Sequence, residues 1–135
     1  MQSSANKNRI VWMLLAITSL VLIAIFAMGY FENQQSFYAN YKEAKKSGAF
    51  ERGWLPEYLP KSAKNIHEQH NLDTNQGWAD FEFDVKDITK MESHCQLSEK
   101  NQHEQKFSCS ETDKTAETFV LQLDGKGYYT SSYKH

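Results

Sequence analysis

Two histidines and one aspartate near the middle of the chain have the residue types of a metal site. His67 and His70 are three residues apart in a segment that we expect to be helical, Ala63–His70, so both rings can face the same way. Asp73 follows in a predicted turn and can supply a third ligand. Zinc and copper accept such a set, so a metal-binding sensor or carrier is our alternative function. We favour a structural role, in which His70 interacts with the helix dipole.

The only two cysteines, Cys95 and Cys109, offer two kinds of chemistry. In an exported domain an even number predicts a disulfide, which closes a loop of about 15 residues and adds up to about 3 kcal/mol of stability. A zinc site that also uses His94 and His103 is the alternative. Its spacing is unfavourable, because no C-x-x-C pair is present and adjacent His94 and Cys95 rarely reach one ion. We expect the disulfide, or free buried thiols if the domain is cytosolic.

Catalytic patterns are missing from the sequence. The carboxylates Asp80, Glu82 and Asp84 alternate along one segment, but they lack the spacing of a calcium loop. A glycosidase needs one carboxyl group with a raised pKa, and a solvated strand face is the simpler interpretation. The chain contains no G-x-S-x-G, Walker or Gly-rich dinucleotide motif. We therefore expect a non-enzymatic protein without a cofactor.

Three aromatic residues are our candidates for binding a partner: Trp54, Tyr58 and Trp78. Exposed aromatic side chains dominate the energetics of protein interfaces, and the expected partner is another envelope protein. The alternative is that these side chains pack in the core. The net charge of the 135-residue chain is only −2, so no basic surface predicts nucleic-acid binding.

An uncharged apolar run predicts a transmembrane helix at 10–31, after a short polar N-terminus at 1–9. Its 22 residues would span roughly 33 Å as a helix, enough to cross a bilayer core. Lys7 and Arg9 flank its N-terminal end, so the positive-inside rule favours a domain on the outer side. The prediction is a single-pass protein of the inner membrane with a periplasmic or extracytoplasmic domain. A signal peptide cleaved after Gly29 is the alternative, although its apolar region is usually 7–15 residues long.

The segment 32–48 predicts an amphipathic stalk helix that continues from the membrane. Phe37, Tyr41 and Ala44 share one face of such a helix, and Gly48 is placed to end it. The stripe can pack on its own domain, which we favour, or form a seam between copies of the chain. A homo-oligomer through the stalk therefore remains possible.

The remaining residues, 49–135, predict one small domain of the α+β class, with short helices packed on one face of an antiparallel sheet. The segment Gly53–Pro60 contains both prolines and reads as a rigid apolar connector. We expect helices at Ala63–His70 and Val85–Cys95 and a loop at Gln96–Gln105. Turns are expected at Leu72–Gly77 and Asp124–Gly127, and alternation predicts strands at Trp78–Asp84, Phe107–Ser110, Thr118–Leu123 and Tyr128–Tyr133.

The middle of the chain resembles a group of uncharacterised bacterial membrane-anchored proteins. The resemblance rests on G-W-L-P-x-x-L-P-K-S-A-x-x-I-H at Gly53–His67, on L-D-T-N at Leu72–Asn75 and on W-x-x-F-x-F at Trp78–Phe83. It implies a bacterial envelope setting and one small domain. No activity is known for that group, so the resemblance implies no catalytic residue.

Overall fold

The computed structural model describes residues 2–109 and 115–133, with side chains described for 6–29, 33–109 and 115–132. The chain divides into two compact units, Met1–Glu32 and Asn33–His135. The first unit contains the helix α1, Gln2–Glu32. The second is an α+β domain built on a seven-stranded antiparallel sheet. The predicted fold class is therefore confirmed.

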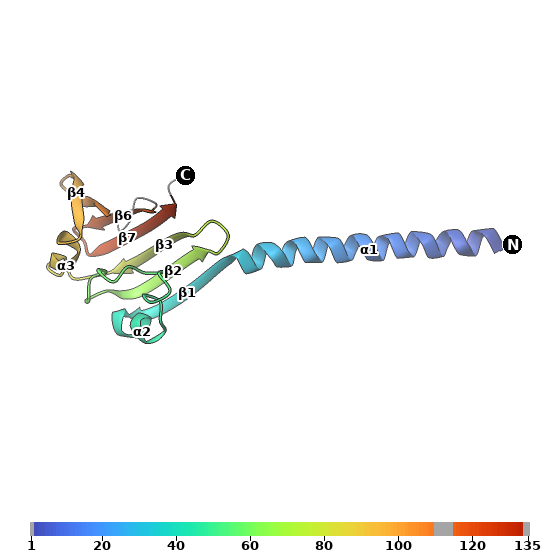
Figure 1. Cartoon of the computed structure of the whole chain (residues 1–135), viewed down its shortest axis with the longest axis horizontal. Coiled ribbons are helices and arrows are strands. Elements are labelled where there is room, and N and C mark those ends of the chain that lie inside the picture. The colour runs from blue at the N-terminus through green and yellow to red at the C-terminus, as the bar shows by residue number, and fades with distance from the viewer. Residues whose placement is uncertain (1, 110–114, 134–135) are drawn as a thin grey trace. The chain divides into compact units, whose positions relative to one another are not determined.

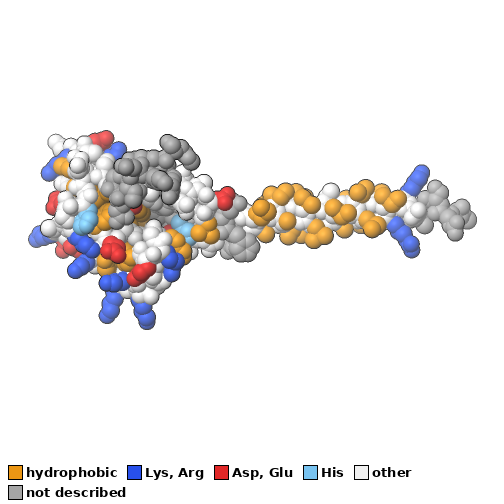
Figure 2. Space-filling model, viewed as in Figure 1, with side chains coloured by type: hydrophobic (Ala, Val, Ile, Leu, Met, Phe, Trp, Pro, Cys, Tyr) orange, Lys and Arg blue, Asp and Glu red, His pale blue; other side chains and the backbone are white. Residues whose placement is uncertain are grey.

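Within the described residues, α1 is the one helix long and apolar enough to cross a membrane. Its candidate membrane span, Asn6–Gly29, contains an 18-residue stretch with a mean hydropathy of 2.7 and no buried residues. Figure 2 shows hydrophobic side chains along the middle of this helix, which residues from Ile10 to Met28 supply. Its two interior hydroxyl groups do not leave polar atoms unpaired, because Thr18 and Ser19 each donate to a carbonyl three residues earlier at 2.9 Å.

The sheet has the strand order β1-β2-β3-β7-β6-β5-β4 (Figure 1). Each strand runs antiparallel to its neighbours. Because β1 and β4 stand at the two ends of this order, they are the edge strands. The helices α2 and α3 lie in the connections. The strands are β1 Asn33–Asn40, β2 Lys64–Asn71, β3 Gln76–Glu82, β4 Cys95–Lys100, β5 Glu104–Cys109, β6 Thr115–Gln122 and β7 Lys126–Tyr133; the helices are α2 Tyr41–Lys46 and α3 Thr89–Glu92.

The predicted stalk helix at 32–48 is wrong. Its first half is the edge strand β1, which pairs with β2, and only the short helix α2 follows. In the strand Phe37 is exposed and Tyr38 is buried, so the apolar stripe does not lie on one helical face. The expected oligomer seam loses its basis for the same reason. Gly48 does follow the end of α2, with a φ of +81°.

The predicted helix Ala63–His70 is also wrong, because this segment forms β2. Ile66, Glu68 and His70 are buried and alternate with more exposed neighbours, which is the two-residue period of a strand. Two of these three buried positions hold polar side chains, and this hides the period in the sequence. Ser62 caps no helix; its hydroxyl group accepts a hydrogen bond from the Asp84 amide at 3.0 Å.

Later segments agree better with the predictions. The strands near Trp78, Phe107, Thr118 and Tyr128 are all present, although Ser110 lies outside the described residues. The predicted loop Gln96–Gln105 is instead mostly strand, since it contains β4 and the start of β5. The helix expected at Val85–Cys95 is reduced to the four residues of α3.

One face of the sheet carries the hydrophobic core. Ile66, Phe81, Phe119 and Tyr129 come from four strands and are nearly inaccessible to solvent. The connector Gly53–Pro60 is buried, apart from its first residues and Glu57. The helices and the connector contribute these buried side chains to the same cluster: Ala44, Leu55, Tyr58, Leu59 and Met91.

Candidate functional site: a polar cleft across the sheet

One of the rows of register partners that cross all seven strands lies near one end of the sheet. Partners in adjacent antiparallel strands point to the same face. This row borders the apolar core, and most of its members are polar. From β1 to β4 it runs Gln34, His70, Gly77, Ser131, Glu117, Cys109 and Cys95.

Gly77 leaves a gap in this row. It lies between His70 and Ser131 and has no side chain to fill the space between them. A Cβ atom at this position would lie 3.0 Å from the Ser131 hydroxyl oxygen and 3.8 Å from the Gln69 carbonyl oxygen. The absence of a side chain therefore helps to form a cleft on the covered face of the sheet.

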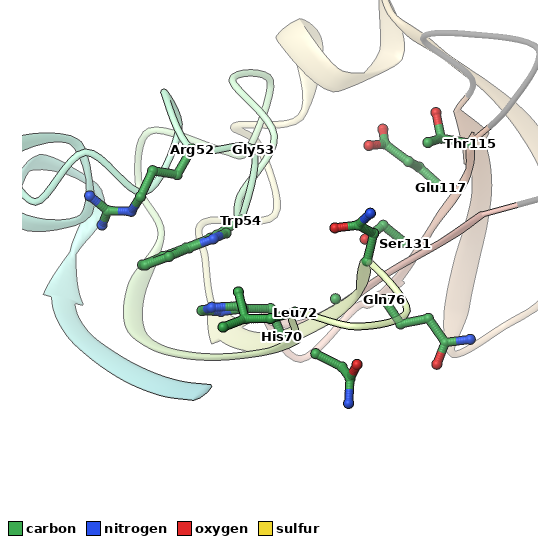
Figure 3. Close-up of a pocket in the computed structure, with 12 residues that line it drawn as sticks. Arg52, Gly53, Trp54, His70, Leu72, Gln76, Thr115, Glu117 and Ser131 are labelled. Carbon is green, nitrogen blue, oxygen red and sulfur yellow. The ribbon is translucent and has the colours of Figure 1, made fainter. Parts of the chain in front are cut away.

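The cleft has a volume of about 330 Å³, at the small end of the range for ligand sites. Figure 3 shows Trp54 and His70 on one side and Thr115 and Glu117 on the other, with Ser131 between them. The β2–β3 turn and the strand ends beside it supply a further part of the lining, in which three of four side chains are polar: Asn71, Leu72, Asn75 and Gln76.

The first wall is a stack of three side chains. The Trp54 ring lies on the His70 ring, with a centroid distance of 4.0 Å and an interplanar angle of 20°. The Arg52 guanidinium carbon lies 3.8 Å from the centre of the Trp54 ring, a cation–π contact. Figure 3 places Trp54 between the other two side chains, with Arg52 extending away from Glu117. The stack fixes Trp54 as a preformed wall.

The buried carboxyl group of Glu68 contacts His70, the innermost side chain of this stack. His70 Nδ1 lies 2.7 Å from Glu68 Oε1, and Glu68 is fully buried. Burial raises the pKa of the Glu68 carboxyl above its ordinary 4.5, while hydrogen bonds from His70 and Ser36 and the charge of Arg52 act in the opposite direction. Glu68 Oε2 and His70 Nε2 have no hydrogen-bond partner among the described residues.

Glu117 forms the opposite wall. Its carboxylate accepts a hydrogen bond from the hydroxyl group of Tyr129 at 3.0 Å and another from the hydroxyl group of Tyr58. Burial raises the pKa of Glu117, and the hydrogen bond from Tyr129 lowers it to a smaller extent. Among the described residues no lysine, arginine or histidine forms an ion pair with this carboxylate.

Two polar members of the row, Ser131 and His70, lie on opposite sides of Gly77. Ser131 and His70 are separated by β3, so their backbones lie roughly 9–10 Å apart, and the gap above Gly77 lies between them. Ser131 lines the cleft.

The residues of the predicted metal site do not converge. In strand β2 His67 and His70 point to opposite faces, because they are three residues apart. His67 pairs with Asp80 at 3.4 Å, and Asp73 lies in the exposed β2–β3 turn. Among the residues that the structure describes, no three His, Cys, Asp or Glu side chains form a group able to hold a metal ion.

The predicted disulfide is present. Cys95 and Cys109 are direct register partners on β4 and β5 and form an S–S bond. Both cysteines are buried. The zinc alternative is wrong, because neither sulfur atom is a free thiolate and His103 belongs to the loop before β5.

The three candidate partner-binding aromatics occupy different environments. Tyr58 is 2% exposed and belongs to the core, so it does not form a docking surface. Trp54 is half-buried in the wall of the cleft. Trp78 is 39% exposed on the uncovered face of the sheet, where its ring nitrogen donates to Gln69 Oε1 at 2.6 Å.

Sequence reasoning missed several residues of the site, among them Arg52, Glu68, Gly77, Glu117 and Ser131. Gly77 was assigned only a role in a turn. Glu68 carried a usable signal, because a carboxylate two residues before a histidine places both on the same face if the segment is a strand. Glu117 lies in no motif, and the pairing of β6 with β7 brings it to the cleft.

The comparison with family models matches part of this domain. The model of the YbbD head domain matches residues 32–82, which contain β1, α2, the connector, β2 and β3. The match covers less than half of the chain and is consistent with the resemblance to uncharacterised bacterial proteins. No curated protein and no solved structure matches the chain. The matched stretch contains Trp54, His70 and Gly77, while Glu117 and Ser131 lie beyond it.

Proposed function

We propose that this protein is anchored by α1 in the cytoplasmic membrane, and that its domain is a non-enzymatic binding module on the outer side. The apolar helix and the match to the YbbD head domain fit a membrane-anchored soluble domain. The length of the uncharged apolar run, which begins at Ile10 within the candidate span Asn6–Gly29, supports an uncleaved anchor over a signal peptide.

Two features support an extracytoplasmic side for the domain. The Cys95–Cys109 disulfide joins paired strands, and stable disulfides are rare in the reducing cytosol. Lys7 and Arg9 precede the apolar helix, and such residues favour the cytoplasmic side. An N-terminus inside and a domain outside satisfy both.

The observation that carries the binding proposal is the cleft above Gly77. It is preformed, because the Arg52–Trp54–His70 stack and the tyrosine-held Glu117 fix its two walls. It combines one aromatic wall with a few convergent polar groups, the usual composition of a small-molecule site. The proposed ligand is therefore a small polar molecule bound without chemical change.

The test is a fragment screen by NMR on the full-length protein in a neutral detergent. The set contains small anions, amines, zwitterions and sugars, and the Trp54 and Trp78 indole signals report on the two sheet faces. We expect binders to shift the signals of Trp54 and the Gly77 amide and to leave Trp78 unchanged. Binders confined to Trp78, or no binders in any class, would contradict the proposal.

A further inference from the structure

Glu117 is a carboxylate that lacks a cationic partner among the described residues. Its side chain is half-buried, and no described cation lies within ion-pairing distance. Burying an unpaired charge is costly, so such groups are usually protonated or paired. The raised pKa of Glu117 reflects this cost. A cation that enters the cleft would offset it.

The hydrogen bonds of Glu117 leave room for such a cation. Each of its two carboxylate oxygens accepts one tyrosine hydroxyl group, from Tyr129 and from Tyr58. A carboxylate offers about four lone-pair sites, so roughly two remain. The tyrosines hold the carboxylate in place, and the open lone pairs can accept from a donor in the cleft, where Glu117 is a lining residue.

The rest of the cleft also favours a donor-rich, positively charged ligand. Ser131 and the amide side chains of Asn75 and Gln76 can accept hydrogen bonds from a polar skeleton. Among the described residues of the lining, Arg52 is the only lysine or arginine, and Figure 3 shows that its side chain extends away from Glu117. Glu117 therefore provides the charge at its end of the cleft.

We propose that the cleft binds the primary ammonium group of a small polar molecule, with the ammonium on Glu117 and the polar skeleton over Gly77 beside Ser131. The inference rests on the binding function proposed above and specifies its ligand class. An ammonium group supplies three donors, and charge-assisted hydrogen bonds are roughly twice as strong as neutral ones. Glucosamine is a suitable probe, because glucose has nearly the same shape without the charge.

The groups around Glu117 determine how binding depends on pH. The hydroxyl groups of Tyr58 and Tyr129 face it, and the His94 ring stacks on Tyr58 with a centroid distance of 5.3 Å. The ammonium group needs the ionised carboxylate, so its affinity decreases as Glu117 becomes protonated on acidification. Binding below neutral pH should therefore release a proton, which calorimetry in buffers of different ionisation enthalpy measures.

The experiment uses full-length protein in neutral detergent, with Trp12 and Trp78 replaced by Phe so that Trp54 alone reports by fluorescence. We expect glucosamine to bind at least about tenfold more tightly than glucose. Glu117→Gln should remove this preference, while the matched exposed variant Glu57→Gln should keep it. Melting temperatures of the variants identify a folding defect, and the glucosamine–glucose comparison needs no substitution in the cleft.

Lys114→Gln is an essential control, because residue 114 lies next to β6 in the sequence and outside the described residues. The proposal predicts that glucosamine binds to this variant and to the parent protein. Binding only in Lys114→Gln would identify an internal cation as the occupant and overturn the proposal. Equal affinity for glucose and glucosamine, or a preference that survives Glu117→Gln, would also overturn it. If other fragments still bind near Trp54, the binding function stands and only the ligand class fails.

Discussion

His70 Nδ1 and Glu68 Oε1 lie 2.7 Å apart inside the domain, beneath the ring of Trp54. The two side chains are neighbours on the same face of β2, and both are buried. Such a pair costs desolvation energy, and replacing one member is more harmful than replacing both. The pair links the cleft wall to the core, and burial raises the pKa of Glu68, so the protonation of Glu68 affects the stability of the domain.

The first prediction concerns pH and stability. Burial raises the pKa of both Glu68 and Glu117 above 4.5, so the folded domain holds protons that the unfolded chain has lost. The contribution of these groups to stability is full below the unfolded pKa and is lost as the pH rises through the folded pKa. We expect the melting temperature to decrease from mildly acidic toward neutral pH, as measured by circular dichroism.

Glu68→Gln should flatten this pH dependence, because the amide does not titrate. Glu82→Gln is a control of opposite sign: hydrogen bonds from Asn65 and Lys64 lower the pKa of Glu82, so its contribution is lost on acidification. An unchanged pH profile in both Glu68→Gln and Glu117→Gln would show that neither group carries the effect.

The second prediction concerns the floor of the cleft. Gly77→Ala should change stability by less than about 1 kcal/mol, because its Cβ meets only the Ser131 hydroxyl at 3.0 Å and a carbonyl at 3.8 Å. It should still weaken ligand binding by filling the gap. Gly127→Ala is the contrasting variant, since its Cβ would lie 2.4 Å from the Phe81 ring. Urea denaturation should show a loss of about 1–3 kcal/mol for Gly127→Ala, and equal losses in the two variants would contradict the description of the cleft.

The third prediction concerns the disulfide. The double variant Cys95→Ser/Cys109→Ser removes a cross-link between two residues that are 14 positions apart in the sequence. Unfolding by urea should show a loss of about 3 kcal/mol relative to the oxidised parent protein. The reduced parent protein should behave like the double variant. A stability that does not respond to reduction would contradict a structural role for the bond.

The fourth prediction separates core packing from surface exposure among the aromatics. Tyr58→Ala should lose about 3–5 kcal/mol, because the ring is buried and its hydroxyl group bonds Glu117. Trp78→Ala should cost much less, since this side chain lies on the uncovered face. Thermal denaturation measures the loss of stability in each of the two variants. A similar loss in the two variants would mean that Trp78 is covered in the folded protein.

Local pattern was sufficient for the strands whose buried positions are apolar. Phe81 in β3 and Phe119 and Leu121 in β6 alternate with more exposed residues, and these strands are predicted correctly. In β1 and β2 the same face carries Ser36 and Glu68, so the two-residue period of hydrophobic residues is missing. In both segments the hydrophobic residues happen to lie at helical spacing, and this spacing led to the wrong helix predictions.

The candidate site was less predictable than the fold, because strand pairing creates it. His70, Gly77 and Glu117 come from three different strands, and their shared row depends on a register that no local motif records. The disulfide was predictable, since two cysteines allow one intramolecular pairing. The helix assumed by the metal hypothesis was wrong, because His67 and His70 lie on the strand β2 and point to opposite faces.

The account as a whole depends on the side of the membrane on which the domain folds, and thiol labelling in intact cells measures this directly. We predict that an impermeant maleimide labels Cys95 and Cys109 only after treatment with a reductant that stays outside the inner membrane. A cysteine placed before the apolar helix by Asn6→Cys, in a Cys95→Ser/Cys109→Ser background, should label only after lysis. Labelling of Cys95 and Cys109 only after lysis, and without any reductant, would place the domain in the cytosol and contradict the account.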